Sequence, residues 1–453
     1  MATVLGGIAL SVLDGTVMNL ALPGIALDMQ VSASAVIWVV NAYQLGILTL
    51  LLPLARLGEL FGYKRVYLSG LGLFTLASLA CLFSTTLPQL SAARALQGMG
   101  AAGMFALNAA LVRAIYPQRL LGLGIAINSA VVAVASVAGP SVAALVLSVA
   151  SWHWLFAINL PLGLAVFALG TRSLPGRGSA PADAEGFSMP DAALNVAMFA
   201  LLFLGMDSLL PRAGPASGAT ATEAVLPGAA LLAAGVAVGV VYVWRQRRQP
   251  VPLLPIDLLR IPVFRLSMLT SIAAFAAQML ASIALPFLLL HGLGRSAADA
   301  GLVLTVWPIA TVLAAPVAGR LIGRVADGLL GGIGLLTLAL GLALMALLPE
   351  QPSLAQLAWR LALCGVGFGL FQSPNNHTIV TSAPASRSGA AGGMLGTARL
   401  TGQSLGALAI ALLFSWGLAA EQRAPVSALA LAALCAAVAS GTSLLRLRAA
   451  KPV

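Results

Sequence analysis

Charged side chains are scarce in this sequence. Asp, Glu, Lys and Arg together make up only 8% of its 453 residues, whereas hydrophobic residues make up 60%. Because charged residues average about 25% in soluble domains, this composition excludes an ordinary water-soluble protein. Most of the chain must instead lie in lipid, where the backbone satisfies its own hydrogen bonds as helices or as a closed barrel.

Cysteine and histidine are also rare, with three of each. The cysteines all lie in apolar segments and are odd in number, which argues against a disulfide framework or a metal cluster. The histidines are scattered and no nucleotide-binding loop pattern occurs. Two carboxylates share one apolar segment only at its opposite ends, Asp191 and Asp207. We therefore expect neither an enzyme nor a bound cofactor or metal, and we expect transport driven by an ion gradient, most simply of protons.

Long apolar runs recur along the whole chain. Each run has about 20 residues, enough for a helix to cross a hydrocarbon layer about 30 Å thick, and the runs lack the alternation of barrel strands. The sequence therefore predicts an all-α membrane protein with fourteen transmembrane helices, at residues 2–26, 35–55, 66–84, 87–112, 121–147, 152–171, 190–210, 224–244, 264–290, 297–318, 329–348, 353–376, 388–415 and 426–445.

The basic residues predict the topology. A net charge of +11 would suggest a nucleic-acid partner in a soluble protein, but here most Lys and Arg residues fall in loops on one side of the predicted spans. Only Arg212, Arg295 and Arg423 fall in loops on the other side. By the positive-inside rule both termini are cytoplasmic and the number of spans is even. We expect a multi-pass protein of the bacterial inner membrane, surrounded by lipid and without a nucleic-acid partner.

The first apolar run is also expected to span the membrane. It lacks the basic leader of a secretory signal and carries Asp14 near its centre. A cleaved signal peptide has a basic start and an uncharged apolar core. We therefore expect this run to stay in the mature protein.

Two halves of the sequence resemble each other. Three segments recur with an offset of 263 to 266 residues: Leu22-Pro23 as Leu285-Pro286, Pro53-Leu54-Ala55 as Pro316-Val317-Ala318, and Arg94 to Phe105 as Arg360 to Phe371. Transporters are often built from such repeats, with the binding site between them. We predict an N-terminal six-helix bundle at 1–171, linkers and two inserted helices at 172–263, and a C-terminal six-helix bundle with a short cytoplasmic tail at 264–453.

Asp14 is the clearest candidate for function. At 1.5 Å per residue it lies about 18 Å from the start of the first helix, and Arg94 lies about 10 Å from the outer end of the fourth. In a layer about 30 Å thick, Asp14 is therefore about 12 Å from the outer surface. This is close to the depth of Arg94, so the two side chains can meet. Because an ionisable group in lipid costs at least about 2.5–3.5 kcal/mol, we interpret them as a proton-coupling pair. The alternative is a static buried ion pair; Ala277, the counterpart of Asp14, shows that the acid was not duplicated.

Other charged residues are less decisive. Arg399 lies about 17 Å into the thirteenth span by helix rise, so we expect it to face a cavity or a backbone carbonyl, with functional and structural roles equally open. Asp207 lies at the outer end of its span, where its carboxylate can reach water, and we interpret it as interfacial.

Two further segments are candidates for gating. Gly139-Pro140 in the fifth span would bend its helix and act as a pivot or seal, although tight helix packing is the simpler explanation. Glu59, Gly62, Lys64 and Arg65 are predicted to lie in a short loop. Charge pairing with a neighbouring helix end would let this loop latch one conformation, and a solvated topogenic loop is the alternative.

Several of these positions form motifs. They are Leu13-Asp14-Gly15-Thr16-Val17-Met18-Asn19-Leu20-Ala21-Leu22-Pro23, the group Arg94, Gln97, Gly98 and Gly100, then Ala138-Gly139-Pro140, and Ser151-Trp152-His153-Trp154-Leu155-Phe156-Ala157-Ile158-Asn159-Leu160-Pro161. Through them the chain resembles, over essentially its whole length, the fourteen-spanner drug:proton antiporters of the major facilitator superfamily. The family also carries a motif in the loop between its second and third spans, and this sequence departs from it at Ala55, Glu59, Leu60 and Tyr63. After Gly139-Pro140, Ala143-Ala144 stand where the family usually has a pair of glycines.

The resemblance implies a mechanism and a set of site residues. It implies alternating access by rocking of the two halves, with Asp14 as the protonation and cation-recognition site and Arg94 in proton transfer. We expect the protein to work as a monomer. The substrate cavity is expected to include Asp14, Asn19, Asn41, Gln44, Gln97, Arg360 and Arg399.

The expected function is export of lipophilic, cationic, drug-like compounds in exchange for protons, because one apolar cavity with one acid can bind either a proton or a cationic ligand. Export of an anionic or zwitterionic metabolite or lipid is the alternative, since three Arg residues lie within spans against one clearly buried acid. A sensor or membrane enzyme has little support, because neither a soluble domain nor a catalytic cluster is predicted.

Overall fold

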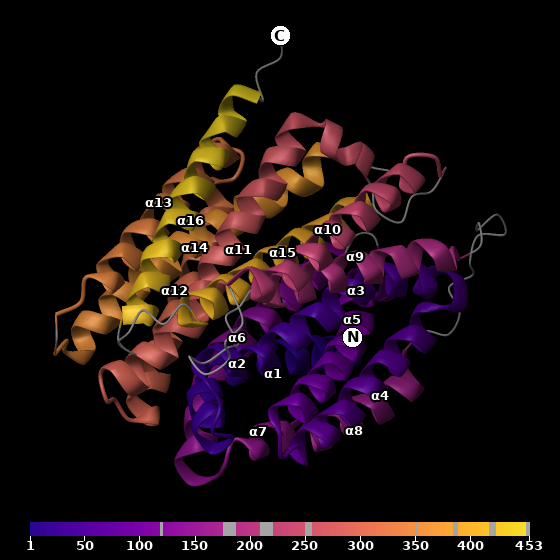
Figure 1. Ribbon diagram of the computed structural model, residues 1–453. Helices are drawn as coiled ribbons and strands as arrows, with labels where there is room; N and C mark the ends of the chain where they lie inside the picture. Colours follow the sequence, from indigo (N-terminus) through magenta and orange to yellow (C-terminus); the bar gives the residue numbers. More distant parts are fainter. Residues whose placement is uncertain are drawn as a thin grey trace. The chain divides into compact units, whose positions relative to one another are not determined.

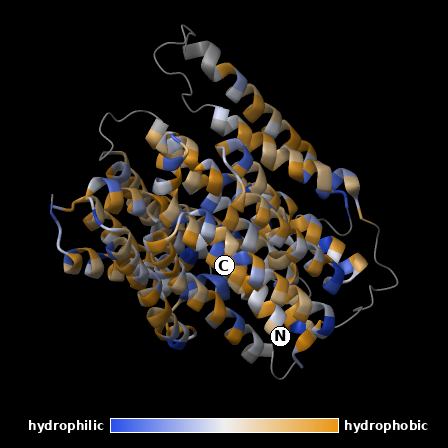
Figure 2. Ribbon diagram, turned by 90° about the horizontal axis from the view of Figure 1, so that it is seen from below, coloured by the Kyte–Doolittle hydropathy of each residue, from blue (hydrophilic) through white to orange (hydrophobic). Residues whose placement is uncertain are grey.

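The computed structural model describes residues 1–117, 121–174, 187–208, 221–249, 256–349, 351–383, 388–415 and 423–449 (Figure 1). Helices account for nearly all of these residues, and no β-strand occurs among them. Hydrophobic residues cover the helices along most of their length (Figure 2). The predicted fold class, an all-α membrane protein, is confirmed.

The helices follow one another along the chain with few other elements between them. In chain order they are α1 (Ala2–Asp28), α2 (Ala33–Val36), α3 (Trp38–Phe61), α4 (Tyr63–Leu82), α5 (Leu87–Ile115), α6 (Leu121–Val149), α7 (His153–Ala157), α8 (Asn159–Ser173), α9 (Met189–Ser208), α10 (Ala221–Gln246), the 3-10 helix η2 (Ile256–Arg260), α11 (Pro262–Phe287), the π-helical turn η3 (Leu288–Gly292), α12 (Ala297–Leu321), α13 (Asp327–Ala346), α14 (Leu354–Ser382), α15 (Ser388–Ser415) and α16 (Arg423–Ala449).

Each predicted apolar run coincides with one of these helices or with a pair of them. Among the residues that the structure describes, eleven helices are long and apolar enough to cross a membrane, and shorter apolar helices occur at Val134–Val149 and Met189–Gly205. The count of fourteen membrane crossings therefore stays a prediction.

The predicted loop between the second and third spans is wrong. The α-helix continues to Phe61 and the next one begins at Tyr63, so Glu59 lies in α3, and Lys64 and Arg65 lie in α4. Gly62 alone makes the turn, because its φ of 95° lies in a region that is open to glycine and strained for other residues.

The helices pack into two compact units. Unit 1 comprises Met1–Asp14, Met29–Val132 and His153–Ile256, and unit 2 comprises Gly15–Asp28, Ala133–Trp152 and Asp257–Val453. The division at 171 and 263 predicted from the repeat concerns chain topology rather than packing, and it stays a prediction.

The sequence repeat has a counterpart in how helices pack within each unit. In unit 1, α5 packs between α3 and α4, and in unit 2, α14 packs between α12 and α13. A Cβ atom on Gly98 would lie 2.1 Å from the carbonyl oxygen of Tyr43, and one on Gly365 would lie 2.2 Å from that of Trp307. Only glycine permits such backbone approach, so the same contact is built twice.

A hydrogen bond attaches α9, the first of the two inserted helices, to α3, and Pro53 leaves the acceptor of that bond free. Proline has no backbone N–H, so the carbonyl four residues earlier, that of Thr49, lacks its helical donor. The side-chain amide of Asn195 on α9 donates to this oxygen at 2.8 Å. At the start of α9, Asp191 accepts from Nε of Arg245 on α10 at 2.8 Å, which holds the two inserted helices together.

Candidate functional site

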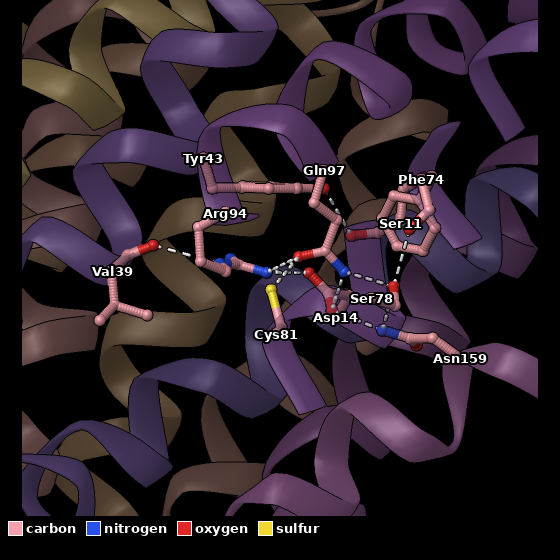
Figure 3. A network of polar contacts seen from close by, with 10 residues as sticks. All are labelled: Ser11, Asp14, Val39, Tyr43, Phe74, Ser78, Cys81, Arg94, Gln97 and Asn159. Atoms are coloured by element: carbon pink, nitrogen blue, oxygen red, sulfur yellow. Dashed lines mark hydrogen bonds and ion pairs between the residues drawn. The ribbon is translucent and has the colours of Figure 1, made fainter. Parts of the chain in front are cut away.

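Asp14 lies at the centre of a buried polar network (Figure 3). Its side chain is 1% exposed. Oδ2 accepts from Nη1 of Arg94 at 2.5 Å, and Oδ1 accepts from the amide of Gln97 at 3.0 Å and from the amide of Asn159 at 2.7 Å. The predicted pairing of Asp14 with Arg94 is therefore present, and it joins α1 to α5 and α8 within unit 1.

Arg94 has partners besides the carboxylate. Its Nε donates to the carbonyl of Val39 at 3.1 Å, and Nη1 donates to Oε1 of Gln97 at 2.5 Å. The guanidinium carbon lies 4.2 Å from the ring centroid of Tyr43, close enough for a cation–π contact. The Arg94 side chain is 1% exposed. These contacts offset part of the free-energy cost of burying its charge.

Ser78 on α4 completes the network. Its hydroxyl donates to the carbonyl of Phe74 at 2.8 Å, and it accepts from Gln97 at 2.8 Å and from Asn159 at 3.4 Å. With Val39 and Tyr43 on α3, the network reaches five helices of unit 1.

The network is built for a charged carboxylate. All three nitrogen atoms that face Asp14, on Arg94, Gln97 and Asn159, are hydrogen-bond donors. A protonated carboxyl group would have to donate its own hydrogen, and it would also remove the counter-charge of Arg94. A proton on Asp14 would therefore require side chains of the network to rearrange.

The other predicted cavity residues lie outside this network. Asn41 and Gln44 are buried on α3, and Asn19 is half-buried on α1. Within the described part of the chain, Oδ1 of Asn19 and Oδ1 of Asn41 have no hydrogen-bond partner. Of the predicted cavity residues, the structure thus brings together Asp14 and Gln97.

The two intramembrane arginines of the second half have different surroundings. Arg360 is half-buried in the second turn of α14, where Nη1 donates to the carbonyl of Gln356 at 2.8 Å and the guanidinium lies 4.6 Å from the ring of Trp359. Arg399 is half-buried on α15, and its guanidinium lies 5.4 Å from the ring of Phe275. Neither has an acidic partner among the residues that the structure describes.

The predicted gating residues divide into separate contacts. Glu59 pairs with Arg56 of its own helix at 2.7 Å, whereas Nζ of Lys64 donates to the carbonyl of Thr171 at the end of α8, also at 2.7 Å. Arg65 is exposed. The Lys64 contact joins two helix ends, as a latch would, and its role as a latch stays a prediction.

Gly139 and Pro140 lie inside α6, in the part of that helix that belongs to unit 2. A Cβ atom on Gly139 would lie 2.1 Å from Oγ1 of Thr16, so glycine permits α6 to approach the second half of α1. One residue on, the hydroxyl of Ser141 lies 2.8 Å from that of Thr305 on α12. Tight packing is thus present, and the pivot remains a prediction. The side chain of Asp207 and the whole of Arg212 lie outside the described residues.

Asn159, Ser78 and Tyr43 were not predicted as members of the site. Asn159 is an amide inside an apolar segment, but nothing in the sequence places it beside Asp14. A buried polar cluster in unit 2, centred on Arg446, was not predicted either.

Arg446 lies just beyond the last predicted span, and the structure buries it. Its side chain is 2% exposed. It donates to Oδ1 of Asn375 at 2.9 Å, to Ser267 at 3.1 Å and to Ser443. Gly331 leaves room for it, since a Cβ atom there would lie 3.0 Å from Nη2 of Arg446.

Comparisons with known proteins agree with this architecture. The profile described as Major Facilitator Superfamily matches residues 4–262 and 266–452. The chain is 51% identical to "Uncharacterized transporter YebQ" of Escherichia coli (strain K12), over 91% of this chain and 88% of that protein. It is 29% identical to "Riboflavin transporter RibZ" of Clostridioides difficile (strain 630), over 92% of this chain and 88% of that protein.

A third relative is "Multidrug resistance protein Stp" of Mycobacterium tuberculosis (strain CDC 1551 / Oshkosh), 30% identical over 88% of this chain and 72% of that protein. The profile covers nearly the whole chain, and these relatives are matched over most of their length. The chain therefore belongs to the Major Facilitator Superfamily, and it is a multi-pass membrane transporter, not an enzyme.

Proposed function

We propose that this transporter exports small lipophilic molecules in exchange for protons, by alternating access, and that Asp14 binds and releases the proton. The observation that carries the proposal is the Asp14 network: a carboxylate enclosed in the membrane-spanning part, held by three donors from two other helices. The multidrug resistance protein among the relatives supports export of drug-like compounds.

In this mechanism the deprotonated carboxylate fastens α1 to α5 and α8. A proton that reaches Asp14 cancels the ion pair with Arg94, and removal of one partner from a buried pair typically costs about 3–5 kcal/mol. Arg94 keeps its contacts to Val39, Gln97 and Tyr43, so it stays in place on α5 while α1 is released. When the proton leaves on the other side of the membrane, the network closes again.

The remaining features belong to the same proposal. The protein lies in the bacterial inner membrane with both termini cytoplasmic, and it works as a monomer. The proton gradient supplies the energy, so no cofactor is needed, and its partners are the substrate, protons and lipid.

Arg399 favours a second candidate function, export of an anionic or zwitterionic compound. Its guanidinium stacks on Phe275 and has no acidic partner within the described ranges. A cation in the membrane core without a counter-charge is costly, and an anionic substrate would supply that charge. Under this alternative Asp14 still carries the proton, and Arg399 recognises the substrate.

Transport in inverted membrane vesicles tests both. A pH gradient is imposed, and uptake of cationic, neutral and anionic lipophilic compounds is measured with and without a protonophore. The proposal predicts uptake that is strongest for cationic compounds and that is lost when the protonophore dissipates the gradient. Uptake that ignores the gradient for every compound would refute proton exchange, and gradient-driven uptake of anions alone would favour the second candidate.

A further inference from the structure

A groove of about 250 Å³ lies between α11 and α15 in unit 2. From α11 it is lined by Arg265, Met268 and Ile272, and from α15 by Met394, Thr397 and Thr401. Within each helix these residues are three or four positions apart, so each set forms one stripe along its helix. Neither the Asp14 network nor the Arg446 cluster includes any of them.

The packing of glycines explains why the groove is open. Further along α15, a Cβ atom on Gly402 would lie 2.4 Å from the carbonyl oxygen of Ile272, and one on Gly406 would lie 2.5 Å from that of Ala276. The two helices are thus in backbone contact beyond the groove. The groove lies nearer the start of each helix, where Met268 on α11 and Met394 and Thr397 on α15 line it.

The walls of the groove suit an acyl chain. Apart from the two threonines and Arg265 they are hydrocarbon or thioether, and Oγ1 of Thr397 is turned to the carbonyl of Gly393 in its own helix. Leu269, which also lines the groove, is 48% exposed. The first and last residues of each stripe are seven positions apart, or about 10 Å, which is about two thirds of one leaflet of a layer about 30 Å thick.

The mouth of the groove carries positive charge. Arg265 lies in the first turn of α11 and is exposed, and Arg260 is exposed at the end of η2, five residues earlier. Asp257 of η2 is exposed as well and has an interaction of its own, and the two arginines outnumber it. Guanidinium groups at the end of an apolar groove match a phosphate above an acyl chain, because Arg binds phosphate oxygens through paired N–H groups.

We infer that this groove binds one phospholipid with an anionic headgroup, its acyl chain along the α11 and α15 stripes and its phosphate on Arg265. The inference requires only that the chain spans a bilayer, and it is independent of proton exchange. Hydrocarbon can reach the groove at Leu269, which is 48% exposed. The arginines select among lipids because the surface potential of anionic headgroups attracts bases near the membrane.

Photolabelling of the intact, purified protein tests the inference. The probe is phosphatidylglycerol with a diazirine in its acyl chain, and the labelled peptides are identified by mass spectrometry. We expect adducts in the segments 265–272 and 394–401, which unlabelled phosphatidylglycerol reduces and phosphatidylcholine does not. Arg265→Gln should weaken labelling about fivefold, the effect of one base near an anionic surface.

Two further variants keep the test decisive. Arg320→Gln removes an exposed arginine from the last turn of α12 and should leave labelling unchanged. Thr397→Phe fills the groove without removing a bond between helices and should abolish labelling of both segments.

Three outcomes would overturn the inference. They are labelling spread evenly over the helices, equal labelling by a phosphatidylcholine probe with no effect of Arg265→Gln, and displacement of the lipid by an exported compound. The last result would make the groove a substrate site.

Discussion

Replacing Asp14 by asparagine removes one negative charge while the size of the side chain stays the same. The amide oxygen can still accept from Gln97 and Asn159, but the new NH₂ group faces Nη1 of Arg94, a donor, across a distance of 2.5 Å. Loss of one partner from a buried pair costs about 3–5 kcal/mol. The effect on stability should lie toward the lower end, because Arg94 keeps its bonds to Val39 and Gln97.

The transport phenotype is the sharper readout. In inverted vesicles Asp14→Asn should lose uptake driven by a pH gradient, while exchange of substrate down its own gradient persists. Asp28→Asn is the matched control, because Asp28 lies on the same helix and accepts from the indole of Trp152 at 2.9 Å, outside the network. The reasoning would be refuted if a well-expressed Asp14→Asn protein kept gradient-driven uptake at the wild-type rate.

Three further substitutions test the packing and the choice of substrate. Gly98→Ala should lower the free energy of unfolding by about 1–3 kcal/mol, because the new Cβ atom meets a backbone carbonyl of α3. Gly24→Ala is the control, because Gly24 has open space around it and the free energy should not change. Thermal unfolding in detergent measures both variants. Asn195→Leu leaves the carbonyl of Thr49 without its donor and should cost about 1–3 kcal/mol, seen as a lower unfolding temperature, and an unchanged temperature would contradict the docking described here. Arg399→Gln should abolish uptake of anionic compounds and spare cationic ones if the second candidate function holds; equal effects on both would exclude it.

Much of the fold followed from the sequence because its signals are local. Each predicted apolar run coincides with a helix or a pair of helices, and the repeat of Arg94 to Phe105 as Arg360 to Phe371 falls on α5 and α14, which pack in the same way in their units. The Asp14–Arg94 pair was predictable because depth in a bilayer follows from residue number. Two groups that are both costly in lipid and lie at the same depth are expected to meet.

The remaining features depended on helix rotation and on single residues. Asn159 reaches Asp14 only because α8 presents that face to α1, which the spacing of 145 residues does not reveal. The predicted latch loop disappeared because Gly62 turns the chain in one residue. Nothing in the sequence showed that Arg446, just beyond the last predicted span, would be buried, and Gly331 leaves the space for it on α13.

Proton binding by Asp14 can be observed without knowing the substrate. Infrared difference spectroscopy of the purified protein during acidification reports the carbonyl band of each carboxyl group that takes up a proton. The account predicts that one of these bands appears in the wild type and in Asp28→Asn but is missing in Asp14→Asn. It also predicts a change in guanidinium absorption as the Arg94 ion pair breaks. Identical spectra for wild type and Asp14→Asn would contradict it.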